Sequence, residues 1–451
     1  MIGTLREILG FGERSYQLTV PRSEENEGLL ILGDPGTGKS QVIHQLLDQI
    51  ARRKPQEAVI CYDPAGEFIE RHFDPDRDIV LNPLDLRCPE WRPCYDDLGR
   101  FPMMQFIAES FFPCPEHTAA NTQFFIKAAR SIFAHMLWFS PTPERLVEML
   151  SDESLIDYCV VRTEHAHLIA KDAKGQRGGV LATLSEIGES FKLLQSEERP
   201  KRWLSLYKWT RQRNGWIFIT STHSTRESLR RLQAAWINML LGNLLSTYDA
   251  SGRACWMIID EVHSLKHLPI LSSTLVEARK YGVKIVLGTQ NKAQFEEHYG
   301  RGAATMLASS HTKIFFRCNE PESARWVSEI IGEEEKERPR IGTTATVQAN
   351  GRDSINYSTF TERRSVVSKE QIMALPNLQG YWKYGDSVVP FRIEPIDRPK
   401  VAESFIPRPP KPVIQKELKQ QTLGINAPSS GNGEHATEIT TEMIDDVDTE
   451  F

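Results

Sequence analysis

The sequence predicts an α/β protein with a mainly parallel, twisted sheet and an inserted all-helical domain. Two observations predict this fold class. Short apolar runs alternate with stretches of helical spacing in residues 1–95 and again in residues 199–407, and such alternation is typical of parallel strands joined by crossover helices. Residues 96–198, in contrast, contain helical stretches and no convincing succession of strands.

The expected strands are short and mostly apolar, as strands buried on both faces of a parallel sheet should be. In the first part of the chain we expect strands at residues 16–20, 29–32, 58–62 and 78–81. In the second part we expect them at residues 216–220, 255–261, 284–290 and 312–317.

The middle block is expected to hold helices at residues 103–112, 121–139, 144–150, 153–161 and 179–194. The second of these carries an apolar stripe, which we expect to lie in the core: Phe124, Phe125, Ala128, Ile132, Phe133 and Leu137. Residues 333–360 are polar and contain Gly and Thr, which favours a mobile loop. Residues 408–451 have little to bury and are expected to form a disordered acidic tail.

Charge is unevenly distributed along the 451 residues, whose net charge is −6. Residues 431–451 hold seven acidic residues and no Lys or Arg, so the rest of the chain carries a net charge of +1. A nucleic-acid surface would therefore have to be a local basic patch. Two clusters are candidates, each with a solvated helix face as the alternative: Arg52, Arg53 and Lys54, and Arg226, Arg230 and Arg231.

Cysteine usage and hydropathy argue against several classes of protein. The seven cysteines are dispersed and include no C-x-x-C pair, which argues against a disulfide scaffold or a zinc site. The sequence has no signal-peptide core and no apolar run near the roughly 18 residues that cross a bilayer. We therefore expect a cytoplasmic protein with reduced thiols.

The most informative stretch matches the phosphate-binding loop pattern G-x-x-x-x-G-K-[ST]. Its residues are Gly33, Asp34, Pro35, Gly36, Thr37, Gly38, Lys39 and Ser40. The glycines let backbone N–H groups point at a phosphate, Lys39 reaches the β and γ phosphates, and the Ser40 hydroxyl ligates Mg²⁺. A strand is expected before the loop and a helix after it, so we predict that ATP and Mg²⁺ bind here.

Three polar residues follow two later strands. Asp260 and Glu261 end an apolar run, where Asp260 would hold Mg²⁺ and Glu261 would polarise the attacking water as a general base. Gln290 also ends a strand, and its amide would donate to the γ-phosphate and orient water. An acidic turn for the first two residues and a plain strand cap for Gln290 are the alternatives.

Phosphate-loop enzymes often receive an arginine from a neighbouring subunit. We place Arg317 first because it ends a strand of the same sheet, and the other candidates are Arg279, Arg325, Arg363 and Arg364. For any of them, a surface ion pair is the alternative.

Together the motifs resemble the coupling proteins of conjugative type IV secretion, the TraD/TrwB type. The resemblance runs from about residue 28 to residue 407. The motifs that carry it are residues 33–40, 63–67, 82–85 with Trp91, 259–268, 277–282, 288–294 with Tyr299 and Gly300, 362–367 and 375–378.

The resemblance implies a RecA-like ATPase domain with an inserted all-alpha domain, assembled as a homo-hexamer. It also implies ATP-driven delivery of DNA, single-stranded with its relaxase or double-stranded, to secretion channel proteins. Members usually begin with two transmembrane helices, and we expect none here, so we expect a cytoplasmic protein or one held at the inner membrane by partners. The acidic tail resembles tails that bind relaxosome accessory proteins, and a tail that only keeps the protein soluble is the alternative.

Two alternatives remain open at this point. The first is an adaptor that recruits protein cargo through the helical domain and the acidic tail, with the nucleotide only setting its conformation. The second is a DNA pump of the FtsK/HerA kind.

Overall fold

The computed structural model describes residues 3–7, 14–18, 20–96, 101–115, 118–139, 142–194, 202–246, 253–300, 302–344 and 354–409. The described residues up to Arg408 form one compact unit. The predicted acidic tail therefore lies almost wholly outside the described residues.

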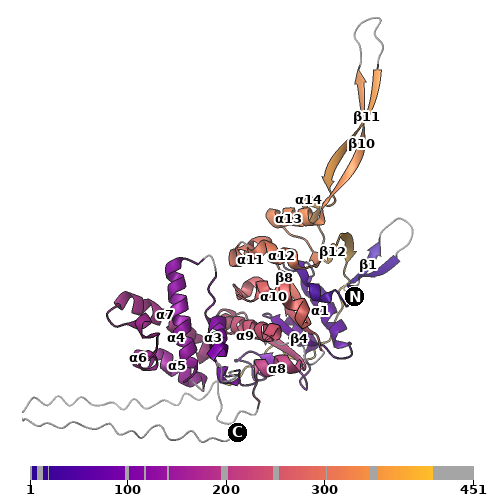
Figure 1. Cartoon of the computed structure of the whole chain (residues 1–451). Coiled ribbons are helices and arrows are strands. Elements are labelled where there is room, and N and C mark those ends of the chain that lie inside the picture. Colours follow the sequence, from indigo (N-terminus) through magenta and orange to yellow (C-terminus); the bar gives the residue numbers. More distant parts are fainter. Residues whose placement is uncertain are drawn as a thin grey trace, which may run out of the picture. The chain divides into compact units, whose positions relative to one another are not determined.

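A nine-stranded sheet forms the centre of the compact unit (Figure 1). Its strands, in spatial order, are β13 (Ser387–Arg392), β12 (Gln379–Tyr384), β9 (Thr312–Phe315), β3 (Leu29–Leu32), β8 (Val283–Thr289), β7 (Cys255–Ile259), β4 (Ala58–Asp63), β6 (Trp216–Thr220) and β5 (Ile79–Leu81). From β9 to β5 all neighbours pair in parallel, whereas β12 and β13 add an antiparallel edge. The predicted fold class is confirmed, and so are the seven strands that pair in parallel from β9 to β5, whereas the antiparallel strands β12 and β13 were not predicted.

Register places several strand ends at one edge of this sheet. Leu32 at the end of β3 pairs with Thr289 at the end of β8 and with Phe315 at the end of β9. Because parallel strands present their carboxyl ends at the same edge, the residues that follow β3, β7, β8 and β9 meet there.

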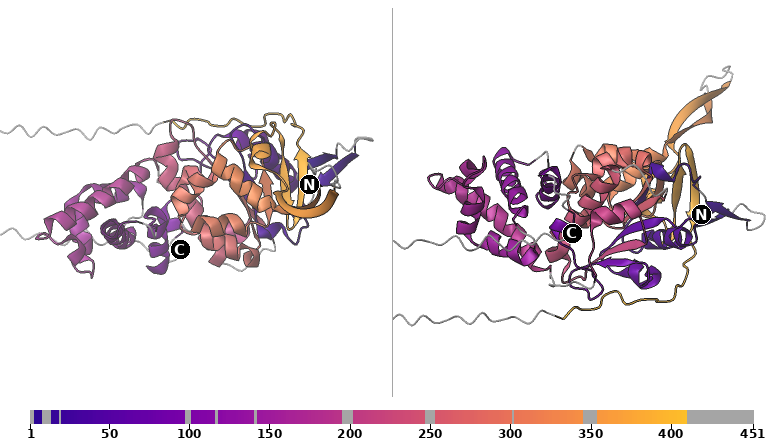
Figure 2. Two further views of the ribbon diagram at one scale, coloured as in Figure 1. Left: turned by 90° about the horizontal axis from the view of Figure 1, so that it is seen from above. Right: turned by 60° about the horizontal axis from the view of Figure 1, so that its bottom comes forward.

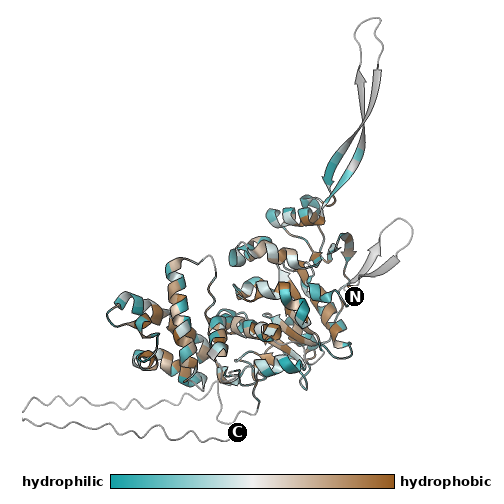
Figure 3. Ribbon diagram, viewed as in Figure 1, coloured by the Kyte–Doolittle hydropathy of each residue, from teal (hydrophilic) through white to brown (hydrophobic). Residues whose placement is uncertain are grey.

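Helices cover both faces of the sheet, so alternate residues of a strand enter different cores. In β3, Ile31 packs on the side of α1 (Lys39–Ala51) and α2 (Glu67–His72), whereas Leu30 packs on the side of α9 (Arg226–Ser246). Figure 3 shows strands of the central sheet in brown, as apolar elements, and the helices as mixed.

The middle of the chain is helical, as predicted. Its helices are α3 (Phe101–Phe111), α4 (Ala120–Leu137), α5 (Pro143–Ser151), α6 (Glu153–Val160) and α7 (Lys174–Lys192), and Figure 2 shows them gathered beside the sheet region. The stripe on α4 is largely buried, but Phe124 is 39% exposed. Rings of Phe111, Phe133 and Phe191 contact one another, and this core continues into the sheet face below α9.

The remaining helices connect or cover strands. They are α8 (Leu206–Gln212), α10 (Leu271–Glu277), α11 (Lys292–Tyr299), α12 (Gly302–Ser309), α13 (Pro321–Ile331) and α14 (Lys369–Met373), with short 3-10 turns that include η1 (Glu25–Glu27), η4 (Val262–Leu265) and η5 (Ala278–Tyr281). In the part of the chain that the structure describes, no helix combines the length and apolarity needed to cross a bilayer.

The prediction of a loop at residues 333–360 is wrong for most of these residues. Strands β10 (Glu333–Thr344) and β11 (Ser354–Ser365) pair antiparallel as a hairpin that stands away from the main sheet (Figure 1). Sequence patterning missed it because its signal is cross-strand charge and not apolar alternation: Glu335 lies opposite Arg363, and the two side chains form an ion pair. Strands β1 (Gly3–Glu7) and β2 (Arg14–Leu18) form a second ribbon.

A network of buried charges lies at the edge of the main sheet where the parallel strands begin, opposite the edge where they end. Lys284, at the start of β8, contacts both Glu25 and Glu57, and Arg53 contacts the same two carboxylates. Both cations also lie over the Trp256 ring. Arg53 is thus held inside the protein, so the predicted role of Arg53 in binding DNA phosphates is wrong: two carboxylates already neutralise it.

Candidate nucleotide site

The phosphate-binding loop joins β3 to α1 at the centre of the sheet edge. Gly36 and Gly38 have φ of +72° and +125°, which residues with a side chain rarely adopt. A Cβ at Gly33 would lie 2.6 Å from Phe316 Cβ, so β9 packs directly against the loop. The Thr37 hydroxyl donates to the Asp34 carbonyl at 2.7 Å. These contacts fix the curl of the loop by backbone geometry.

Lys39 starts α1 and reaches back over the loop. Its Nζ donates to the carbonyl oxygens of Gly33 at 2.6 Å and Asp34 at 3.0 Å. Burial lowers the pKa of Lys39, and the carboxylates of Asp260, Glu261 and Asp34 act in the opposite direction. The predicted cation and the predicted acidic pair are therefore close enough to interact across the sheet edge.

Asp260 follows β7, and its carboxyl is buried. Burial raises the pKa of Asp260 to about 6, against the attraction of Lys39. Its Oδ1 atom is buried and has no hydrogen-bond partner among the described residues. The neighbouring strand β8 approaches so closely that a Cβ at Gly288 would lie 2.0 Å from the Asp260 carbonyl oxygen. A glycine at 288 therefore brings the end of β8 to the end of β7.

Glu261 is held by side chains from three elements. Gln290, which follows β8, donates from Nε2 to Glu261 Oε1 at 2.8 Å. Arg226 of α9 lies 3.5 Å from Glu261 Oε2, and His263 Nε2 lies 3.4 Å from Oε1. The two residues predicted to handle the attacking water are thus in direct contact, and Arg226, predicted only as a DNA contact, belongs to the same cluster.

Two further carboxylates, Asp63 and Glu67, were not predicted as site residues. Asp63 ends β4 and accepts backbone N–H groups of Glu67, Phe68 and Ile69 at 2.9 Å each; burial raises its pKa to about 7. Glu67 accepts hydrogen bonds from His44 and Ser40, and the His44 bond is the main reason that its pKa is lowered. Sequence reasoning used residues 63–67 only as a motif, although a Glu after a strand end was the available signal.

The residues present fit a magnesium-bound phosphate group. Ser40, Glu67 and Asp260 supply hydroxyl and carboxylate oxygens, the ligands that Mg²⁺ prefers. Asp260 Oδ1 is a buried acceptor that lacks a donor among the described residues, and such an atom is costly to leave without a cation or a hydrogen bond. Space is available as well, because a Cβ at Gly36 would meet nothing within 4 Å.

Arg317 lies beside the loop of its own chain. Its carbonyl accepts the Asp34 backbone N–H at 2.9 Å, and its Nη1 donates to the Leu375 carbonyl at 3.3 Å. Its buried Nε has no partner among the described residues. Arg279 instead pairs with Glu27, Arg325 with Glu322 and Arg363 with Glu335. Of these four, only Arg317 makes contact with the phosphate-binding loop.

Comparison with known proteins places this site in a family. Residues 16–394 match the family model described as "Type IV secretion-system coupling protein DNA-binding domain". The chain is 30% identical over 422 residues to coupling protein TraD of Escherichia coli (strain K12), covering 90% of this chain and 58% of TraD. It is 28% identical over 394 residues to the probable conjugal transfer protein TraG of Sinorhizobium fredii (strain NBRC 101917 / NGR234), covering 82% and 56%. The chain thus spans a little over half the length of these relatives.

Solved structures of the conjugative coupling protein TrwB share the fold. The unbound monoclinic form of TrwBdeltaN70 has a TM-score of 0.74 at 24% identity, covering 86% of this chain and 89% of TrwB. A TrwB complex with ADP and Mg²⁺ has a TM-score of 0.74 at 22% identity, covering 89% and 96%. Since the family model spans most of the sequence, the chain belongs to the family of type IV secretion-system coupling proteins.

Proposed function

We propose that this chain is an ATPase that uses ATP hydrolysis to move DNA toward a type IV secretion channel. The observation that carries the proposal is the meeting of Lys39, Asp260 and Glu261 at one sheet edge, with Gln290 bound to Glu261. A phosphate-binding loop alone indicates nucleotide binding, whereas a half-buried acidic pair beside it supplies what hydrolysis needs.

Each residue of the site has a proposed role. The backbone of residues 33–40 and Lys39 bind the phosphates of ATP, and Ser40 and Asp260 hold Mg²⁺, which would neutralise charge on the phosphates when bound. Glu67 lies beside Ser40 and supports the same position. TrwB, which shares the fold, is known in complex with ADP and Mg²⁺ and with a non-hydrolysable ATP analogue.

Glu261 accepts a proton from the attacking water, and Gln290 keeps the Glu261 carboxylate oriented while sensing the γ-phosphate. The hydrogen bond from Gln290 and the nearby Arg226 guanidinium support this role, because both hold the carboxylate in one place. Arg317 contributes positive charge from beside the loop, either to its own site or to that of a neighbour.

The substrate and partners follow from the family. We propose that a homo-hexameric ring tracks DNA, single-stranded or double-stranded, and delivers it with a relaxase to channel proteins. The helical block at 96–198 would form a domain inserted between the two parts of the ATPase domain, residues 1–95 and 199–407, and residues 408–451 would bind a relaxosome accessory protein. The protein would work in the cytoplasm or at the inner membrane through partners.

The test is the ATPase rate of the full chain, at concentrations where electron microscopy shows rings, with and without single-stranded DNA. We expect stimulation by DNA and loss of all activity in Lys39→Ala. An equal rate with and without DNA would reject the motor, and hydrolysis by Lys39→Ala at the normal rate would reject the site.

A further inference from the structure

A pocket of about 370 Å³ lies between the helical block and the sheet domain, away from the phosphate-binding loop. Its walls come from α3, α4 and α7 on one side and from α9, η4 and α11 on the other. We infer that this pocket binds one nucleotide unit of single-stranded DNA and reports its presence to Glu261. The inference rests on the proposed function and assigns it a DNA-contact site.

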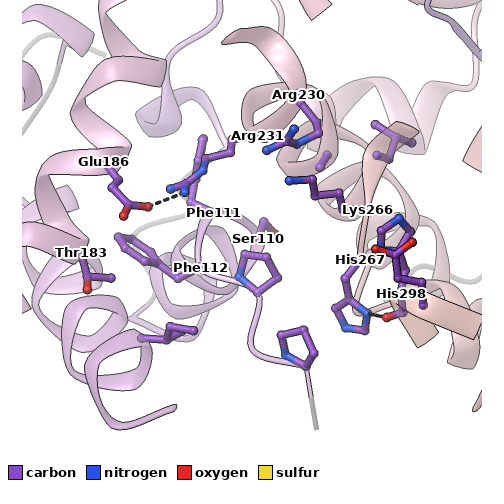
Figure 4. Close-up of a pocket in the computed structure, with 16 residues that line it drawn as sticks. Ser110, Phe111, Phe112, Thr183, Glu186, Arg230, Arg231, Lys266, His267 and His298 are labelled. Atoms are coloured by element: carbon purple, nitrogen blue, oxygen red, sulfur yellow. Dashed lines mark hydrogen bonds and ion pairs between the residues drawn. The ribbon is translucent and has the colours of Figure 1, made fainter. Parts of the chain in front are cut away.

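The pocket combines a cationic side with an apolar one. Figure 4 shows Arg230, Arg231 and Lys266 gathered on one side, with the Lys266 side chain extending toward the two arginines, and Phe112 on an adjoining wall. A phosphate would lie against the cations and a base against the apolar wall, which also includes Pro113 and Ile126. The volume lies at the lower end of the range for small-ligand pockets, which suits one nucleotide and not a duplex.

The charges around the pocket leave Lys266 available. Arg231 pairs with Glu186, and Arg230 pairs with the largely exposed Glu227. Glu297 also lines the pocket. No carboxylate of the described residues lies within ion-pair distance of Lys266, so its ammonium is the group that a phosphate would meet first.

The backbone at Lys266 is strained in a way that presents this side chain. Lys266 has φ of +57° and ψ of −125°, a conformation suited to glycine. A residue with a side chain is strained in this conformation, and such positions concentrate at functional sites. A glycine would adopt this turn with less strain, so the side chain of Lys266 is kept at an unfavourable backbone position, as expected for a residue that contacts a ligand.

Two short segments connect the pocket to the nucleotide site. Arg226, which lies 3.5 Å from Glu261, and Arg230 are one turn apart at the start of α9. Glu261 and Lys266 flank the single turn of η4 (Val262–Leu265) on either side. A phosphate that draws Lys266 and Arg230 together would therefore act on both segments that position Glu261.

The test uses Lys266→Gly in the full chain, because this change removes the ammonium and relieves the strained backbone. Binding of labelled dT20 is measured by anisotropy, without nucleotide, over a range of salt concentrations. We expect affinity to fall about five- to tenfold and the slope of log K against log salt to become shallower by about 0.7 for each phosphate that the protein no longer neutralises. The matched control is Lys171→Ala, whose side chain is 83% exposed on the helical block and which should behave like the unmodified protein. Unchanged affinity and slope in Lys266→Gly would overturn the inference.

Amine-reactive footprinting separates the possible sources of the phosphate. We expect dT20 to protect Lys266, but not Lys171, and we expect dTMP or inorganic phosphate to protect Lys266 only at much higher concentration. Protection by dTMP without protection by dT20 would overturn the DNA assignment in favour of a free nucleotide. If DNA stimulates hydrolysis while Lys266→Gly binds dT20 normally, the assignment of this pocket to DNA is wrong and the proposed motor function is kept. If DNA does not change the hydrolysis rate of the unmodified protein, the proposed motor function itself is rejected.

Discussion

Replacing Asp260 with Asn should make the protein more stable when metal and nucleotide are absent, although it should remove the proposed Mg²⁺ ligand. The carboxyl is buried at the end of β7, and its burial raises the pKa to about 6 from an ordinary value of 3.8. The nearby carboxylates Glu67 and Glu261 add to this effect, and Lys39 offsets only part of it. The negative charge of an ionised Asp260 therefore lowers the stability of the folded protein, and a bound cation would offset this loss.

Proton linkage gives the sign and size of the effect that Asp260 has on stability. A raised pKa means that the folded state keeps a proton that the unfolded state has lost, so this contribution to stability is present below about pH 4 and disappears as pH rises through about 6. Each pKa unit is worth about 1.4 kcal/mol, so the full shift corresponds to about 3 kcal/mol at pH 8. Because the new amide also needs hydrogen-bond partners, we expect Asp260→Asn to add about 1–2 kcal/mol to the free energy of unfolding at pH 8. At pH 5 the contribution from ionisation is smaller by about 1.4 kcal/mol, so most of this advantage should be lost.

The assay is urea unfolding of matched concentrations of the two proteins in a metal chelator, at pH 8, 7, 6 and 5. Asp386→Asn, in an exposed turn, is the control and should change stability by less than about 0.5 kcal/mol. Adding Mg²⁺ and ATP should stabilise the unmodified protein and leave Asp260→Asn nearly unchanged. The reasoning is refuted if Asp260→Asn has no advantage at pH 8, or if its advantage is the same from pH 8 to pH 5.

Three further predictions concern the strand β8. Gly288→Ala should destabilise the protein by about 1–3 kcal/mol in urea unfolding, because its Cβ would overlap the end of β7; Gly178→Ala, where a Cβ meets nothing within 4 Å, should stabilise slightly, and equal effects of the two would contradict this. Gln290→Ala should lower kcat about ten- to hundredfold with little change in KM for ATP, since it frees the Glu261 carboxylate; a change in KM alone would argue for a binding role. Lys284→Met should lower the free energy of unfolding by about 3–5 kcal/mol, because it removes one cationic partner from two buried carboxylates. A loss below about 1 kcal/mol would show that Arg53 alone is enough to neutralise these carboxylates.

The sequence was enough to predict the seven parallel strands of the sheet and the phosphate-binding loop. Both rest on local signals: fully apolar runs such as residues 29–32 read as buried strands, and the loop pattern is defined by backbone chemistry. The places of Gln290 and Glu261 at strand ends were also predicted, but the hydrogen bond between them was not. Their roles in catalysis stay predictions.

Other features depend on pairings that a single chain pattern does not reveal. The charged hairpin of β10 and β11 has no apolar alternation, so a periodicity search misses it. Arg53 looks like a surface cation in sequence, yet its partners Glu25 and Glu57 come from separate elements. Glu67 and Arg226 reach the site only through the packing of α2 and α9. In each case tertiary contact, not propensity, decides the outcome.

The buried charges around Lys284 have a mechanical consequence for the proposed motor. Lys284 fixes one end of β8 to Glu25 and Glu57, and the missing side chain at Gly288 lets the other end lie tightly against β7. Because β8 is held at both ends, we expect it to keep its position in the sheet when phosphate binds or dissociates. We expect the conformational change that accompanies hydrolysis to occur in the turns on either side of Glu261. The sheet should keep its shape during this change.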